Sequence, residues 1–238
     1  MADGALQGLR LIEIGAGAAT EICGQLLADH GCDVIRVLAP APRVPDTEVL
    51  GRNKRCLALD FCTTAGSEVL AALLARADFL LLGSLPANIV QSVPDSLLQA
   101  MDDPALVRIH LPAQPDARQP FATTFRKAAF AAFGAMLALH HRHRTGAGQL
   151  VRADPDGQLS GLMSALEQDL AAGIDPVATA GASVTERHRA TIRPQLSATP
   201  GKLQWPPDAG QAQTAAILAE VLDMAEDDLM RLRQAGAI

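Results

Sequence analysis

The stretch "LIEIGAGAATEICGQLLADHGCDVIRVL", residues 11–38, carries the pattern that decides the fold. Its two ends are apolar runs typical of buried strands, and its middle has apolar residues at helical spacing. Thr20 is the predicted N-cap of this helix, and Gly31 is its predicted C-terminal stop. A strand, a helix and a strand in this order predict two parallel strands joined by a right-handed crossover.

The same alternation continues to residue 111. Further strands are expected at 52–61, 78–84 and 105–111, and helices at 63–77, capped by Thr63 or Thr64, and at 96–102. Strands that alternate with helices in this way predict a doubly wound, mainly parallel α/β sheet.

The pattern changes after residue 112. Residues 123–148 predict one long helix that is apolar almost all round and therefore buried. A short strand and a helix at 157–173 follow, and then comes a segment with little periodicity. We therefore predict an α/β domain at 1–172, an extended linker at 173–213, and C-terminal helices at 214–238. These helices, broken near Met224, are expected to pack on the large domain or on a partner.

Composition and charge narrow the function. The net charge of −6 and the pI of about 5.5 argue against a nucleic-acid partner, which requires a basic face. The four cysteines show no CxxC spacing, so neither a zinc site nor a disulfide framework is expected. The first residues do not resemble a signal peptide, and no apolar run is long enough to span a membrane. These features favour a cytoplasmic protein.

The glycines at 15 and 17 leave three interpretations open. A dinucleotide-binding turn needs GxGxxG and an acid after the second strand, but here Thr20 takes the third glycine position and Leu38 ends the strand. A methyl-donor site would also need that acid. The third interpretation is structural, because glycine lets a strand turn sharply into a helix.

Several motifs together resemble family III CoA-transferases, which include formyl-CoA transferase, carnitine CoA-transferase and α-methylacyl-CoA racemase. The similar stretches are residues 8–37, "RNKRCLALDF" at 52–61, "HRHRTGAGQLV" at 141–151 and the C-terminal helices. The resemblance implies a Rossmann-like large domain and an interlocked dimer. It also implies candidate coenzyme A contacts, two of them largely through the backbone (Leu59 and Asp60) and three through side chains: Arg52, Lys54 and Arg55. For these three side chains, a solvated loop is an equally good interpretation.

The chain departs from this family in ways that affect its chemistry. The segment that carries the family's catalytic aspartate is not recognisable, and the nearby Asp116 stands in a different context. Ala39 and Cys62 stand where the family has basic contacts, "LGSLPA" at 82–87 replaces a CoA-lining motif, and the small domain is missing. No catalytic residue is therefore assigned.

These departures predict a non-catalytic subunit or scaffold. No cofactor is firmly assigned, and any binding of coenzyme A or acyl-CoA should be weak. The expected partner is a full-length family III paralogue or a second copy of the chain. Two alternatives stay open: an active acyl-CoA transferase or racemase with a rebuilt site, and a protein that binds S-adenosylmethionine or a nucleotide.

Other polar and aromatic residues are expected to have structural roles. Three histidines near the end of the long helix, at 140, 141 and 143, are expected to favour the helix dipole rather than a metal. Glu13 is expected to be solvated or to cap a helix. Cys56 and Cys62 are expected to be buried, and Trp205 is expected to anchor the extended segment.

Overall fold

A computed structural model describes residues 4–40, 50–112, 121–153 and 213–238. Its six strands are β1 (Arg10–Ile14), β2 (Asp33–Leu38), β3 (Lys54–Ala58), β4 (Phe79–Leu82), β5 (Val107–His110) and β6 (Leu150–Arg152). Its helices are α1 (Ala18–Asp29), α2 (Thr64–Leu74), α3 (Ala87–Ser92), α4 (Asp95–Met101), α5 (Phe121–Thr145), α8 (Thr214–Leu222) and α9 (Glu226–Gln234).

The strands form one parallel sheet in the order β3-β2-β1-β4-β5-β6. This order reverses between β1 and β4, as in doubly wound dinucleotide-binding folds. The predicted α/β class and parallel sheet are confirmed, as is the first strand-helix-strand unit.

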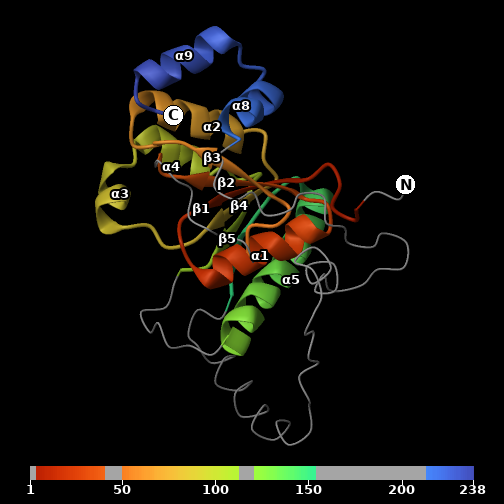
Figure 1. Ribbon diagram of the computed structural model, residues 1–238. Helices are drawn as coiled ribbons and strands as arrows, with labels where there is room; N and C mark the ends of the chain where they lie inside the picture. The colour runs from red at the N-terminus through yellow and green to blue at the C-terminus, as the bar shows by residue number, and fades with distance from the viewer. Residues whose placement is uncertain (1–3, 41–49, 113–120, 154–212) are drawn as a thin grey trace, which may run out of the picture.

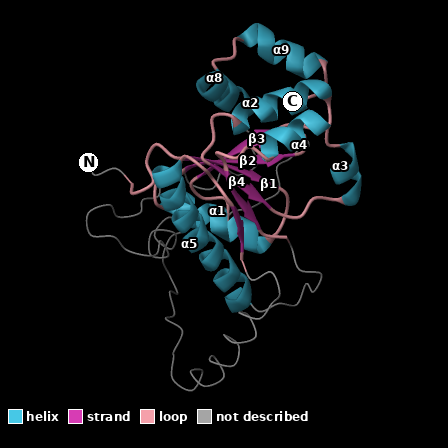
Figure 2. Ribbon diagram, turned by 180° about the vertical axis from the view of Figure 1, so that it is seen from behind, coloured by secondary structure: helices cyan, strands magenta, loops and turns pink. Residues whose placement is uncertain are grey.

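Helices cover both faces of the sheet, which gives three layers (Figures 1 and 2). Side chains alternate along β1, so Ile12 and Ile14 face one core and Leu11 faces the other. The first core includes residues of α2, α4, α8 and α9, and the second includes residues of α1 and α5. Strands β1, β2 and β4 thus contribute apolar residues to two separate cores.

The ends of α1 differ in part from the prediction. The helix begins at Ala18 with Gly17 as N-cap, and the Thr20 hydroxyl instead donates to the Leu111 carbonyl at 3.0 Å. The Thr20 cap prediction is therefore wrong, because its side chain is needed to tie α1 to the end of β5. Gly31 follows the C-cap with a φ of 98°, as expected for a glycine stop. For α2, the predicted Thr63 cap is confirmed by its bond from the Gly66 N–H.

The long helix α5 is not buried all round. A stripe of alanines packs against α1 and the sheet, with Ala131 and Ala135 fully buried. The opposite face is exposed and apolar; its large side chains are Phe121, Phe125, Phe130, Phe133 and Leu137. The prediction of full burial is wrong within this chain, because the neighbouring elements cover only the side with small residues.

The start of the C-terminal helices lies beside β3, which is the edge strand on the other side of the sheet from β6. The Gln213 N–H donates to the Cys56 carbonyl at 2.7 Å, and the Thr214 hydroxyl accepts from the Ala58 N–H at 3.0 Å. These bonds give hydrogen-bond partners to one carbonyl and one N–H on the outer edge of β3. Two short helices with a break at residues 223–225 confirm the prediction for this region.

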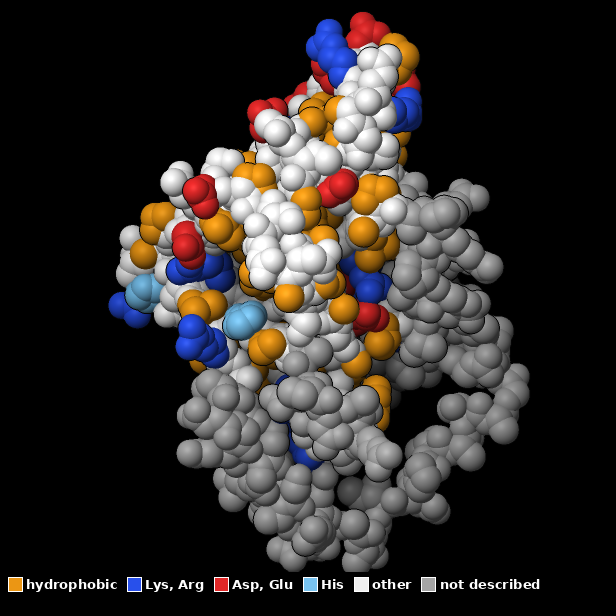
Figure 3. Space-filling view, turned by 90° about the vertical axis from the view of Figure 1, so that its left-hand side faces the viewer, with side chains coloured by type: hydrophobic (Ala, Val, Ile, Leu, Met, Phe, Trp, Pro, Cys, Tyr) orange, Lys and Arg blue, Asp and Glu red, His pale blue; other side chains and the backbone are white. Residues whose placement is uncertain are grey.

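Helix α9 is held by few apolar contacts. Leu229 and Leu232 are its buried residues, while its other side chains are largely charged. Acidic and basic side chains gather at this end of the molecule (Figure 3). The sequence did not indicate α3, because this exposed six-residue helix buries no side chain and so has no apolar stripe.

Some predictions lie outside the described residues. These are the loop around Asp116, the helix at 157–173, nearly all of the 173–213 linker, and Trp205. None of the helices in the described part of the chain is both long enough and apolar enough to cross a membrane.

Candidate functional site

The glycine turn after β1 lies at the point where the strand order reverses. Its backbone pairs directly with the loop after β4: the Ala16 N–H donates to the Ser84 carbonyl, and the Ser84 N–H donates to the Ala16 carbonyl, both at 2.9 Å. Gly15 and Gly17 have φ values of 91° and 144°, which other residues rarely adopt. Doubly wound proteins bind ligands in the crevice at this switch point. Here the two loops are bonded to each other, which supports the structural interpretation of the glycines.

The contact between these loops is tight enough to predict a mutational effect. A Cβ at Gly83 would lie 2.8 Å from the Ala16 carbonyl oxygen and 2.9 Å from the Thr20 Oγ1. Gly83→Ala is therefore expected to lower the free energy of unfolding by about 1–3 kcal/mol, measured by urea denaturation. Ala39→Ser, at an exposed position after β2, serves as the control. An unchanged stability of Gly83→Ala would show that the loops can separate easily.

A buried ionic cluster lies between the sheet and α1. Glu13 and Lys54 both have fully buried side chains, and Lys54 Nζ lies 2.8 Å from Glu13 Oε2. The ammonium also donates to the Glu21 carbonyl at 2.7 Å, and Arg36 Nη2 lies 2.7 Å from Glu21 Oε1. Arg36 Nε lies 3.5 Å from Glu13 Oε1, which joins β1, β2, β3 and α1 in one cluster. The prediction of a solvated or capping Glu13 is wrong, because this side of β1 faces α1.

Two further features show how closely the cluster is packed. A Cβ on Gly24 of α1 would lie only 2.0 Å from Glu13 Oε2, so the absence of a side chain there lets the helix lie over the carboxylate. Burial, with a smaller contribution from the negative charge of Glu13, raises the pKa of Cys23 to about 12. This thiol therefore stays protonated and acts as a small apolar group.

The other two predicted basic contacts are also paired inside the protein. Arg52 Nη2 lies 2.6 Å from Asp29 Oδ2, and Asn53 Nδ2 donates to the other oxygen of Asp29 at 2.8 Å. Arg55 makes two bonds to Asp33, at 2.7 and 2.9 Å. Arg52, Lys54 and Arg55 are all buried, so the alternative of a solvated loop is wrong. Whether any of them meets a phosphate stays a prediction.

The backbone at Leu59 and Asp60 is likewise engaged. The Leu59 N–H donates to the Leu38 carbonyl at 2.8 Å, and its side chain is fully buried. The Asp60 N–H donates to the Ala237 carbonyl at 2.8 Å, so the C-terminal residues lie against this turn. Asp60 Oδ1 accepts from the Cys62 N–H at 3.0 Å. The N–H groups of these two residues, whose backbone is expected to contact CoA, therefore already have partners in the chain.

The remaining candidate residues are spread over the molecule. Cys56 is buried as predicted, whereas Cys62 is half-buried, and burial together with the Asp60 charge raises the pKa of the Cys62 thiol. His140, His141 and His143 are exposed at the end of α5. Among the residues that the structure describes, no group of three or more His, Cys, Asp and Glu side chains could hold a metal ion.

The carboxylates Asp29 and Asp33 were not identified from the sequence as partners of the basic residues. Asp29 lies in the last turn of α1 and Asp33 begins β2, positions where acidic residues are ordinarily solvent-exposed. No local pattern links them to Arg52 and Arg55 across more than twenty residues; only the parallel pairing of β2 with β3 brings them together.

Comparison with known proteins extends the resemblance seen in the sequence. Residues 6–111 match the model of CoA-transferase family III. The succinyl-CoA–D-citramalate CoA-transferase of Chloroflexus aurantiacus is 29% identical over 193 residues, covering 61% of this chain and 48% of that protein. The alpha-methylacyl-CoA racemase of Mus musculus is 37% identical over 111 residues, covering 44% of this chain and 27% of that protein. The chain thus spans about half or less of the length of these curated relatives.

Solved structures share the fold. A CAIB/BAIF family protein from Brucella suis superimposes with a TM-score of 0.54 at 21% identity, covering 73% of this chain and 59% of that protein. The protein Rv3272 of Mycobacterium tuberculosis gives a TM-score of 0.55 at 20% identity, covering 74% of this chain and 61% of that one. Residues 6–111 of this chain are thus similar to CoA-transferase family III, in the family model and in the curated relatives.

Proposed function

We propose that this chain is a non-catalytic subunit or scaffold of a family III CoA-transferase system, bound to a full-length family III paralogue. The observation that carries the proposal is the internal pairing of Arg52, Lys54 and Arg55 with Asp29, Glu13 and Asp33. Coenzyme A is polyanionic, and a cation already held by a buried carboxylate has little attraction left for a phosphate. The free cysteines Cys23, Cys32, Cys56 and Cys62 fit a reducing, cytoplasmic setting.

The loss of these contacts has a predictable magnitude. Each missing charge-assisted hydrogen bond costs about 1.5–3 kcal/mol. Three such losses weaken binding by at least about a thousandfold, since 1.4 kcal/mol corresponds to a factor of ten. The engaged N–H groups of Leu59 and Asp60 add to this loss.

Calorimetric titration of the purified chain with coenzyme A and with acetyl-CoA tests the first half of the proposal. The expected dissociation constant is weaker than about 1 mM, while an active full-length family III enzyme serves as the positive control. Micromolar binding together with acyl transfer to an acceptor would instead support the alternative of an active enzyme with a rebuilt site.

The exposed face of α5 supports the second half. Four of the six phenylalanines of the chain lie on this helix, and Phe121 and Phe133 are 70% and 60% exposed. A groove of about 520 Å³ runs between α5, α1 and the N-terminal turn, lined by Leu6, Leu26 and other apolar side chains. A continuous exposed apolar surface of this kind is typical of a protein interface. A full-length paralogue would cover it and supply the catalytic residues that this chain is expected to lack.

Co-expression with a tagged full-length family III CoA-transferase tests this interface. The wild-type chain is expected to co-purify in a fixed ratio, and Phe133→Asp is expected to reduce its recovery at least about tenfold, because a charge would be buried at the interface. Val90→Asp, on α3 at 56% exposure, is the matched control. Recovery of the chain only as a monomer or a homodimer would contradict the proposal.

A further inference from the structure

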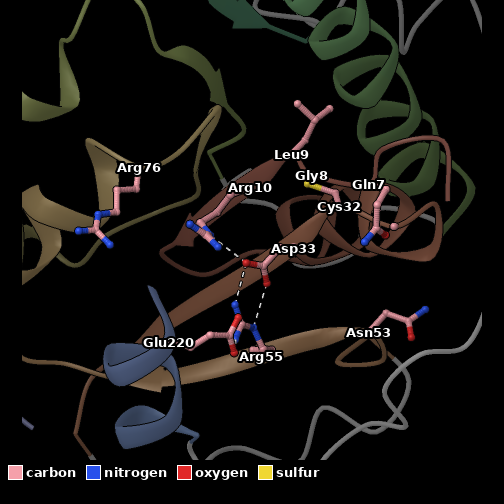
Figure 4. A pocket seen from close by; sticks show the side chains of 11 residues that line it. Gln7, Gly8, Leu9, Arg10, Cys32, Asp33, Asn53, Arg55, Arg76 and Glu220 are labelled. Atoms are coloured by element: carbon pink, nitrogen blue, oxygen red, sulfur yellow. Dashed lines mark hydrogen bonds and ion pairs between the residues drawn. The ribbon is translucent and has the colours of Figure 1, made fainter. Parts of the chain in front are cut away.

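We propose that a polar cavity at the amino ends of the strands binds a small carboxylate- or phosphate-bearing molecule. The cavity has a volume of about 300 Å³ and lies at the opposite edge of the sheet from Leu59 and Asp60. Its walls come from the N-terminal turn, the first residues of β1 and β2, the start of β3, the turn after α2, and α8 (Figure 4). The inference therefore concerns the other end of the strands from Leu59 and Asp60, and its test does not involve coenzyme A.

Three arginines and two carboxylates form the charged part of the lining: Arg10, Arg55, Arg76, Asp33 and Glu220. The cavity thus has one excess positive charge, although the whole chain carries a net charge of −6. A local excess of arginine on an acidic protein attracts anions to this point on the surface.

Both carboxylates are already paired with Arg55. Arg55 donates through Nε and Nη2 to Asp33 and through Nη1 to Glu220, at 2.7–2.9 Å. Figure 4 shows Arg10, Asp33 and Arg55 pointing toward one another beside Glu220. All three nitrogens of Arg55 are thus engaged with carboxylates, so its role is to fix the acidic side of the cavity.

Arg10 and Arg76 keep unused donors. Arg10 bonds Asp33 through Nε at 2.8 Å, and within the described residues its two terminal nitrogens donate no hydrogen bond. Arg76 uses Nη1 for the Val221 carbonyl and the Asp223 carboxylate, and its Nε and Nη2 have no partner in the described part of the chain. An arginine presents five N–H donors in a planar fork, which matches the oxygens of a carboxylate or a phosphate.

The size and polarity of the cavity restrict the ligand further. A volume of about 300 Å³ is at the lower limit for small-molecule sites, and the charged lining does not suit an acyl chain. Gln7 and Asn53 lie on the side of the cavity opposite Arg76 (Figure 4). A short molecule with one or two anionic groups and further hydrogen-bonding groups is the class that fits.

Binding at this point should stabilise the docking of α8. Arg76 holds the end of α8 through Val221 and Asp223, and Arg55 holds Glu220 in the same helix. A ligand bound to Arg76 and Arg10 would join this helix to β1. At ten times its dissociation constant, it should raise the melting temperature by about 3–6 °C.

The test uses the purified full chain with sodium phosphate and sodium malonate, at constant ionic strength adjusted with chloride. We expect at least one of the two to raise the melting temperature and to bind, by calorimetry, with a dissociation constant of about 1 mM or tighter. A response to phosphate alone assigns a phosphate-bearing ligand, and a response to malonate alone assigns a carboxylate. No shift with either anion up to about 20 mM would overturn the proposal.

Variants locate the binding. Arg76→Gln is expected to weaken binding at least about tenfold and, because Arg76 is largely exposed, to leave the unliganded protein folded. Arg76→Lys, which keeps the charge but not the fork, should give a smaller loss. The control is Arg233→Gln on α9, where the arginine has similar exposure and a single acidic partner. Equal binding by Arg76→Gln and the wild type would show that the anion sits elsewhere and would overturn the assignment.

Discussion

Replacing Glu13 by leucine is expected to lower the free energy of unfolding by about 3–5 kcal/mol. The side chain of Lys54 is fully buried, and its ammonium has Glu13 and the Glu21 carbonyl as acceptors. Removing the carboxylate leaves a buried positive charge with only a neutral acceptor. The transfer of such a charge from water is not compensated by one hydrogen bond. Urea denaturation, followed by circular dichroism, measures the loss.

Two further variants make this result interpretable. Glu13→Leu combined with Lys54→Met removes both charges, and the double variant should be more stable than Glu13→Leu alone, because replacing a buried pair by apolar residues is often tolerated. Arg231→Ala breaks an exposed pair with Asp228 and should cost less than about 1 kcal/mol. If Glu13→Leu costs no more than Arg231→Ala, then the cluster is open to water and our account of it is wrong.

Asp29→Ala is expected to have an effect of similar size, through a different set of bonds. The carboxylate of Asp29 is fully buried and accepts from Arg52 Nε and Nη2 and from Asn53 Nδ2, at 2.6–3.2 Å. Its removal takes away the buried carboxylate that pairs with the guanidinium of Arg52. We expect a loss of about 3–5 kcal/mol, which corresponds to a fall in melting temperature of roughly 10 °C for a chain of this length.

The control for this variant is Asp102→Ala. Asp102 pairs with Arg108 at an exposed site. The melting temperature of Asp102→Ala should change by no more than about 2 °C. The same variant bears on function, because Asp29→Ala removes the carboxylate that pairs with Arg52. If the variant then binds coenzyme A measurably in a calorimetric titration, the internal pairing is what suppresses that binding in the wild type.

Local patterns were sufficient for most of the fold. Apart from α3, strand and helix positions up to residue 111 follow from apolar periodicity and from end signals such as Gly31 and Thr63, whose effects act within one or two turns. The sequence left three interpretations of the glycine turn open. The contact of Ala16 with Ser84, nearly seventy residues apart in the chain, supports the structural one.

The site was harder to predict for a physical reason. Arg52, Lys54 and Arg55 look like a basic loop in the sequence, since a motif does not show which carboxylates the fold brings to it. Only the pairing of β1, β2 and β3 and the position of α1 bring the carboxylates of Asp29, Glu13 and Asp33 to these basic side chains. The exposed face of α5 was not predicted either, because periodicity shows which residues are apolar and does not show how much of a helix the described part of the chain covers.

The two outer strands of the sheet set a spatial requirement on the connection between them. The chain leaves the sheet at β6 and returns beside β3, and these strands are at opposite ends of the order β3-β2-β1-β4-β5-β6. Five strand spacings separate them, a distance of about 24 Å. A redesigned connector of fewer than about eight residues could not bridge this width even when fully stretched. Any longer insert, up to an entire folded module, could be accommodated there without altering the pairing of a single strand.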